Sequence, residues 1–134
     1  MPVIPLTVAT TLAAAIAAPL MIDVEIRARG TAERGGTVVV TGLVTCSDDT
    51  VISLEGEVVE FVGHSDVASG TFATDVLCQG GPTAWTAIVD STSGIRFKPG
   101  FASAEVRAVA FDSESGVFSG VQTLARLHLT RSNR

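Results

Sequence analysis

The sequence predicts an all-β protein, an antiparallel two-sheet sandwich of about seven strands. Short runs in which apolar and polar residues alternate are separated by turns rich in Gly, Pro, Asp and Ser. No ten-residue apolar stripe with helical spacing occurs after residue 20. A chain of 134 residues, 46% hydrophobic and 17% charged, is long enough for one domain with its own core. A β-barrel is the alternative architecture.

The N-terminal segment is typical of an export signal. Residues 1–22 carry no charged side chain, and residues 12–18 form the end of an apolar stretch with a small-residue cleavage pattern at Ala15-Ile16-Ala17. We therefore expect a signal peptide over residues 1–17 and a single β-sandwich domain over residues 18–134, with no stable membrane span after processing. The alternatives are a retained membrane anchor and an extra apolar strand or helix packed on the domain.

Three extended runs fill the first half of the predicted domain. The first, residues 22–29, places Ile22, Val24 and Ile26 on one face. The second, residues 38–46, alternates from Val38 to Cys46, and the third, residues 52–58, carries apolar residues opposite Ser and Glu. Turn-forming residues separate the runs: Gly35-Gly36, Ser47 to Thr50, and Gly63 to Asp66. We expect Cys46 on the core face of the second run.

Four further runs complete the predicted strands. They are residues 70–78, residues 85–89, residues 102–110 and residues 121–130. The turns between them are Gly80 to Pro82, Ser91 to Gly94, Lys98-Pro99-Gly100 and Asp112 to Gly116. In each run one parity is apolar, so each is expected to place one face toward a shared core.

The two cysteines, Cys46 and Cys78, are expected to form a disulfide if the chain is exported to an oxidising compartment. Free buried thiols and a metal or redox site are the alternatives. With only His64 and His128 to complete a site, the spacing matches no standard zinc pattern, and the chain has no Cys-x-x-Cys pair.

Several functional classes are disfavoured by the sequence. The formal net charge of −5 and the scattered basic residues argue against nucleic acid as a partner. No hydrolase, zinc-protease, phosphate-loop or dinucleotide motif is present. His64 lies in a predicted loop and His128 on the polar face of the last run, far apart in the sequence. We therefore predict no catalytic residues, no cofactor and no metal site.

Two acidic groups in turns have oxygen ligands that suit calcium. They are Asp48 with Asp49, and Asp112 with Glu114, but neither follows an EF-hand pattern. We therefore expect these four carboxylates to be turn-forming or solvated. On the third run, Glu55, Glu57 and Glu60 form an acidic strip that would discourage edge pairing, face a basic partner, or simply aid solubility, which is the preferred interpretation.

Aromatic residues offer two further candidates. Trp85, the only tryptophan, shares parity with Ala87 and Val89, so we expect it in the core rather than on a carbohydrate-stacking platform. Three phenylalanines near predicted strand ends would form an exposed binding patch or, as we prefer, anchor the core or loops: Phe61, Phe101 and Phe118.

Taken in order, these segments resemble a known family. The Val- and Thr-rich run ends in Cys46, residues 78–81 read Cys-Gln-Gly-Gly, residues 85–89 read Trp-Thr-Ala-Ile-Val, and residues 97–102 read Phe-Lys-Pro-Gly-Phe-Ala. This pattern resembles small secreted actinobacterial immunoglobulin-like proteins of uncharacterised function, over about residues 37–130. The resemblance implies a secreted immunoglobulin-like β-sandwich with a bridge between the two cysteines, and it supplies no catalytic residues.

The function that the sequence favours is a secreted or cell-surface, non-enzymatic β-sandwich module that binds an extracellular protein or glycan, or an envelope component. A structural envelope protein without a specific ligand is the alternative, and an enzyme of unrecognised type is the least favoured. An exposed apolar patch or a long unpaired edge strand would support binding. A pocket in which a histidine and two carboxylates converge would support an enzyme.

Overall fold

Eight β-strands make up the fold in the computed structural model, which describes residues 20–112 and 115–132. The strands are β1 (Ile22–Ile26), β2 (Arg29–Ala32), β3 (Val38–Cys46), β4 (Thr50–Val62), β5 (Asp66–Cys78), β6 (Gly81–Val89), β7 (Gly100–Asp112) and β8 (Val117–Arg131). The predicted all-β class is confirmed. The predicted signal peptide, residues 1–17, lies outside the described residues. Among the residues described, no helix has the length and apolar character that a membrane crossing needs.

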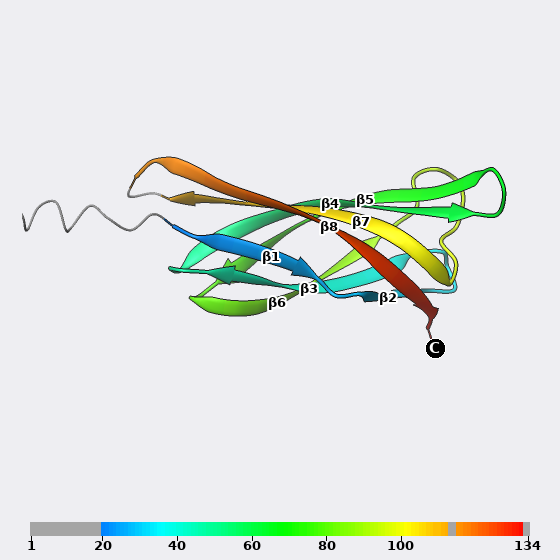
Figure 1. Ribbon diagram of the computed structural model, residues 1–134, viewed down its shortest axis with the longest axis horizontal. Coiled ribbons are helices and arrows are strands. Elements are labelled where there is room, and N and C mark those ends of the chain that lie inside the picture. Colours follow the sequence, from blue (N-terminus) through cyan, green and yellow to red (C-terminus); the bar gives the residue numbers. More distant parts are fainter. Residues whose placement is uncertain (1–19, 113–114, 133–134) are drawn as a thin grey trace, which may run out of the picture.

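The strands lie in two layers (Figure 1). In one layer β3 pairs antiparallel with both β1 and β6. In the other the order is β2-β8-β7-β4-β5. A short pairing of Thr31 and Ala32 with Val39 and Val38 joins the layers, so hydrogen bonds connect all eight strands. We refer to these as the three-strand layer (β1, β3, β6) and the five-strand layer (β2, β8, β7, β4, β5).

The prediction of a single strand over residues 22–29 was wrong, because two strands, β1 and β2, occupy this region. β1 pairs antiparallel with β3, whereas β2 runs parallel to β8 from Arg29 opposite His128 to Ala32 opposite Arg131. The amide of His128 donates to the carbonyl of Ala28 at 2.8 Å. Here the chain leaves one layer for the other, which adds the eighth strand and makes the pairing mixed instead of wholly antiparallel.

Five strands are longer than their sequence patterns indicated. β6 begins at Gly81 instead of Trp85, β7 covers Gly100–Asp112, and β8 covers Val117–Arg131. β4 and β5 show the difference most clearly. β4 continues past Val58 to Val62, and β5 begins at Asp66 instead of Gly70. The two form a hairpin with continuous register over all 13 residues of each strand. Gly63 in the connecting turn has φ of 72°, a conformation that glycine adopts without steric cost. The long hairpin gives the five-strand layer a broad surface.

Alternation places the core between the layers. Every second residue of β3, β4, β6 and β7 points inward and is buried, while its neighbours face solvent. The largest fully buried side chains are Ile52, Leu54, Leu127, Leu129, Val38, Val40, Val44, Val58, Val89, Val106 and Cys78. Burying a Val, Leu or Ile side chain contributes about 1.5–3 kcal/mol, so these positions supply most of the driving force for folding.

Two buried aromatic rings, Trp85 and Phe72, each pack against a glycine on the neighbouring strand. Trp85 lies opposite Gly42 and Phe72 opposite Gly56, and a Cβ at either glycine would overlap the ring. The two rings stack on each other with centroids 5.9 Å apart, which connects β6 of one layer with β5 of the other. Trp85 is only 3% exposed, so its predicted place in the core is confirmed.

The disulfide between Cys46 and Cys78 is confirmed. It joins the last residue of β3 to the last residue of β5, with the two Cα atoms 6.3 Å apart, and so ties the layers together at one end. In the chain-entropy description, closing a loop of about 33 residues stabilises the fold by about 3.7 kcal/mol. That is a large share of an ordinary domain's free energy of unfolding.

Candidate binding face

The two histidines do not meet. His64 lies in the exposed turn between β4 and β5, and His128 points outward from β8. Asp48 and Asp49 are exposed in the turn between β3 and β4, and Glu114 lies outside the described residues. Over residues 20–112 and 115–132, no three His, Cys, Asp or Glu side chains gather in a way that would hold a metal ion.

The acidic strip predicted on the third run is divided by the pleat of β4. Glu55 and Glu57 point to solvent, whereas Glu60 has the opposite parity and is 3% exposed. The Glu60 carboxylate accepts a hydrogen bond from the backbone amide of Lys98 at 2.8 Å. Burial raises the pKa of Glu60 above its ordinary value of 4.5, while that hydrogen bond and the Lys98 charge oppose the rise. Glu60 therefore holds a loop in place, and only the other two glutamates point to solvent.

The three phenylalanines that were expected to anchor the core or loops are exposed instead. Phe61 is 79% exposed, Phe101 60% and Phe118 68%. Their parity explains this result, because neighbouring residues such as Ala102 are the ones that enter the core. Phe61 and Phe101 line one shallow hollow, and Phe118 packs against Phe111 near the opposite end of β7. The prediction of an inward role was wrong.

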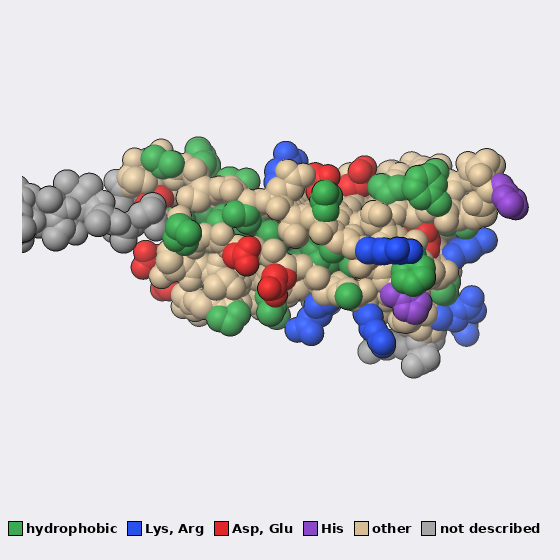
Figure 2. All heavy atoms as spheres, viewed as in Figure 1, with side chains coloured by type: hydrophobic (Ala, Val, Ile, Leu, Met, Phe, Trp, Pro, Cys, Tyr) green, Lys and Arg blue, Asp and Glu red, His purple; other side chains and the backbone are tan. Residues whose placement is uncertain are grey.

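Most of these outward residues share one surface, the outer face of the five-strand layer. It comprises alternate side chains of four strands: residues 51–61 of β4, 67–77 of β5, 101–111 of β7 and 118–128 of β8. The registers place these side chains in rows that cross the strands. Figure 2, in which side chains of both layers are visible, shows basic side chains gathered toward the end where β8 terminates and apolar side chains exposed at both ends. Of the basic side chains, Arg107 and Arg126 belong to the outer face.

At the centre of the outer face, two glutamates oppose each other. Glu57 on β4 is the register partner of Glu105 on β7. Like charges placed directly opposite in antiparallel strands are destabilising. In the next row Glu55 lies opposite Arg107, and their side chains form an exposed ion pair at 3.5 Å. Exposed pairs contribute at most about 1 kcal/mol, so Arg107 is held only weakly at Glu55.

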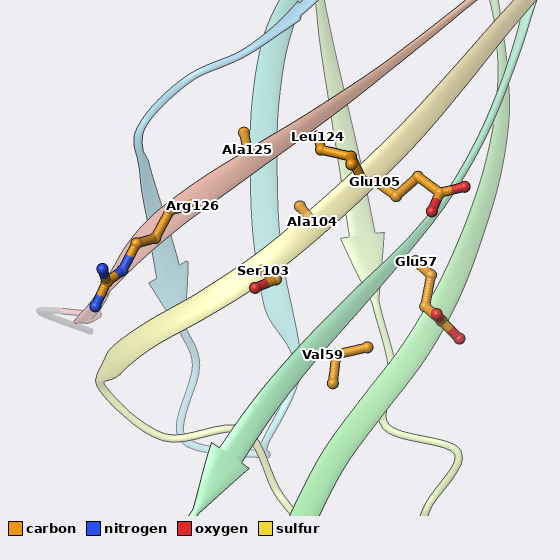
Figure 3. Close-up of a pocket in the computed structure, with 8 residues that line it drawn as sticks. All are labelled: Glu57, Val59, Ser103, Ala104, Glu105, Leu124, Ala125 and Arg126. Carbon is orange, nitrogen blue, oxygen red and sulfur yellow. The ribbon is translucent and has the colours of Figure 1, made fainter.

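The glutamate pair has Leu124, not a cation, beside it on β8. Leu124 is the register partner of Glu105 and is 73% exposed. Figure 3 shows Glu57 and Glu105 reaching toward the same side, whereas Arg126 points in the opposite direction. The guanidinium of Arg126 lies 4.4 Å from the ring centroid of Phe101. That cation–π contact holds the nearest β8 cation away from the carboxylates.

Two shallow hollows flank the glutamate pair. One, of about 380 Å³, is lined by Glu57, Val59, Ser103, Ala104, Glu105, Leu124, Ala125 and Arg126 (Figure 3). The other, of about 530 Å³, is lined by Glu55, Gly56, Glu57, Thr71, Phe72, Ala73, Glu105 and Arg107. Both include Glu57 and Glu105, so the carboxylates lie at the boundary that the hollows share.

At one end of the outer face, Phe101 lies between two outward residues of β8. Its ring stacks on its register partner His128, with centroids 5.1 Å apart, and Arg126 lies over the same ring. Phe61 extends the apolar area on β4. The outer face thus combines an acidic centre with exposed apolar ends, which suits contact with a macromolecule rather than enclosure of a small substrate.

Sequence reasoning missed Glu105, Leu124 and Arg126 as members of this face. The alternation around Glu105 identifies it as outward-facing, and Leu124 has the parity of the polar side of β8. An apolar residue on a polar face is the signal that would have drawn attention to Leu124. The opposition of Glu57 and Glu105 depends on the β4–β7 register, which no local pattern contains.

Comparisons with known proteins identify no family. No family model matches the chain, and no curated protein matches it. Among solved structures, the solution structure of R. palustris CsgH is similar, with a TM-score of 0.41 and 15% identity, covering 82% of this chain and 92% of that chain. A likeness at this level supports no conclusion about function, so the functional argument comes from the chain's own residues.

Proposed function

We propose that this protein is a secreted or cell-surface, non-enzymatic, immunoglobulin-like module that binds a partner protein through the outer face of its five-strand layer. The disulfide supports the extracellular part of the proposal, because such bonds persist in oxidising compartments. The arrangement of β1 and β6 on either side of β3, covered by a second layer, supports an immunoglobulin-like relationship.

One observation carries the binding role: the outer face leaves large apolar side chains in solvent around an opposed glutamate pair. Leu124, the register partner of Glu105, is 73% exposed, and Phe101, four residues away from Glu105 along β7, is 60% exposed. Both features cost free energy in the isolated protein, one by exposing apolar area and the other by like-charge repulsion. A partner that covers the apolar groups and brings a positive charge to the glutamates would remove both costs.

The experiment compares two pairs of neutralised carboxylates. The tagged mature protein, a Glu57→Gln/Glu105→Gln variant and an Asp23→Asn/Glu25→Gln control are each crosslinked to the surface fraction of the producing cell. The control removes the same charge from β1, where both carboxylates are exposed on the other layer. Crosslinked proteins are identified by mass spectrometry, and all three proteins are first shown to have the same melting temperature within a few degrees.

The proposal expects a crosslinked protein that the wild type and the control retain and that the Glu57/Glu105 variant loses. A protein retained equally by all three would move the binding site off the outer face. If no protein is specifically crosslinked by the wild type, the structural role in the envelope replaces the binding role.

A further inference from the structure

The free edge of the five-strand layer extends the outer face. β5 is the last strand of that layer and pairs with β4 alone. In an antiparallel pair, backbone groups alternate between pointing at the neighbouring strand and pointing away from it. Three hydrogen bonds show that the backbone groups of Val67 and Ser69 point away from β4. Thr92 N–H donates to the Ser69 carbonyl at 2.8 Å, Ser93 Oγ–H donates to the Val67 carbonyl at 2.8 Å, and Ser69 N–H donates to Ser93 Oγ at 3.3 Å.

The segment around Thr92 and Ser93 therefore closes one end of the β5 edge. The register with β4 is continuous from Asp66 to Cys78, so the same alternation holds along the strand. The outward backbone groups beyond Ser69 belong to Thr71, Ala73, Asp75 and Leu77. Within residues 20–112 and 115–132, no hydrogen bond to these amides and carbonyls is made from outside β4. The open edge is residues 71–77.

Natural proteins usually block such an edge with charged side chains, lysine above all, with proline or with a bulge, and Asp75 is the one charge that residues 71–77 carry. Residues 71–77 read Thr-Phe-Ala-Thr-Asp-Val-Leu, and they contain neither Lys nor Pro. The uninterrupted β4–β5 register excludes a bulge. The edge spans about 23 Å at the usual rise per residue. It is long enough to pair with an added strand of about seven residues.

Charge on the outer face indicates which strand would pair. Asp75 lies on the edge itself, and the register places Glu55 opposite Ala73 and Glu57 opposite Thr71. An added strand would lie about 10 Å from β4, two strand spacings away. Its long basic side chains would pass over the small side chains of Ala73 and Thr71, above the hollow that these residues line with the two glutamates.

We propose that the open edge of β5, residues 71–77, binds an extended basic segment of a partner protein as an added antiparallel or parallel strand. This inference rests on the proposed function and names the class of partner segment. Backbone hydrogen bonds to the open edge supply affinity, and Lys or Arg at alternate positions face Glu55, Glu57 and Asp75. A second copy of this chain does not suit the edge, because pairing β5 with β5 would bring the same carboxylates together in a protein whose net charge is −5.

The test uses a capped seven-residue peptide in which lysine alternates with threonine or valine. Two matched peptides serve as controls, one with glutamate in place of lysine and one with alternate backbone nitrogens methylated so that they cannot donate hydrogen bonds. Binding to the mature protein is followed by NMR titration and by hydrogen exchange of the backbone amides of residues 71, 73, 75 and 77. The inference expects these four amides to shift and to exchange more slowly with the lysine peptide, and neither control peptide to produce this change.

Three variants test whether the lysine peptide binds at the open edge of β5. Ala73→Pro removes an outward amide without removing a β4 hydrogen bond, and Ala73→Lys blocks the edge by charge if the proline variant does not fold. Each of these two variants should lower the affinity for the lysine peptide by about tenfold or more. Thr86→Lys, at an exposed position on β6 of the other layer, should leave that affinity unchanged. Sedimentation of the protein alone should show no self-association through this edge.

The contrary outcomes separate the two proposals. If the lysine peptide binds and depends on Glu57 and Glu105 but leaves the four amides unprotected, the edge inference is overturned while the proposed binding face stands. Equal binding of the glutamate peptide overturns the basic character of the segment, and self-association through residues 71–77 overturns the choice of occupant. No binding at millimolar peptide overturns the edge inference alone, because the crosslinking experiment tests the proposed function with the cellular partner.

Discussion

The two layers are built by the same alternation yet differ in what they present to solvent. β3 and β6 contain no charged residue, so the three-strand layer carries its exposed carboxylates on β1, at Asp23 and Glu25. The five-strand layer instead carries the opposed glutamates, the Glu55–Arg107 ion pair and exposed aromatic rings. Because both layers bury the same kind of inner face, stability does not require this difference. The proposed binding role accounts for the outward chemistry of the five-strand layer.

The first way to test the comparison is to remove one aromatic ring from the core and one from the outer face. Trp85→Ala should cost about 3–5 kcal/mol, because it leaves a cavity above Gly42 and removes the stack on Phe72. Phe61→Ala, at a side chain 79% exposed, should change stability by less than about 0.5 kcal/mol. Chemical denaturation measures both variants. A comparable loss from Phe61→Ala would mean that the outer face contributes to folding and would contradict its assignment to binding.

The bond that joins the layers should have the next largest effect. Cys46→Ser/Cys78→Ser should lower the free energy of unfolding by about 3.7 kcal/mol and the melting temperature by more than about 10 °C. Intact mass with and without reductant should differ by about two daltons in the wild type, because the reductant supplies two electrons and each sulfur gains one hydrogen atom. Two titratable thiols in the untreated protein would remove the argument for an oxidising compartment. An unchanged melting curve for the double variant would contradict the stabilising effect of the bond.

Glu60 is expected to make a smaller, pH-dependent contribution to the stability of the fold. Burial raises its pKa in the folded protein above the unfolded value of 4.5, so the native state holds this proton more tightly. The contribution of Glu60 to stability is therefore full below pH 4.5 and is lost as pH rises through the folded pKa. Glu60→Gln keeps an oxygen for the Lys98 amide and does not titrate. The melting temperature of the wild type minus that of the variant should rise on acidification from pH 7, and a fall would contradict the assignment.

The smallest expected effect concerns the outer face itself. Glu57→Gln should stabilise the protein by about 0.2–1 kcal/mol at low salt, because it ends the repulsion with Glu105. Added salt should reduce this gain. Glu25→Gln, which lies opposite Leu43 in the three-strand layer, is the control and should change stability little. Equal gains from both variants would show that net charge alone, and not the opposed pair, is responsible.

Much of the fold follows from local pattern. Alternation is enough to predict the strands that face the core, and the parity of Trp85 and Cys46 is enough to place both inside. β2 escapes prediction because Arg29 to Ala32 is short and contains Gly30, and because its partner β8 lies about 100 residues away in the sequence. Loop-closure entropy makes such distant pairings a property of the whole chain and not of the segment.

The outer face of the five-strand layer shows the same division between what local sequence pattern predicts and what depends on long-range pairing. The parity of Glu60 against Glu55 and Glu57 is local, and it alone separates the buried carboxylate from the exposed ones. The opposition of Glu57 and Glu105 and the open backbone of residues 71–77 require the register and the strand order. These two features come from the assembled sheet, which is why the sequence supported a binding module without locating its site.

Hydrogen–deuterium exchange of the mature protein, free and in complex with the partner recovered by crosslinking, tests the central claim most directly. The account predicts that binding slows exchange in β4, β5 and β7, with the largest change between residues 71 and 77, and leaves β1, β3 and β6 as they are in the free protein. Protection confined to β1, β3 or β6 would contradict it.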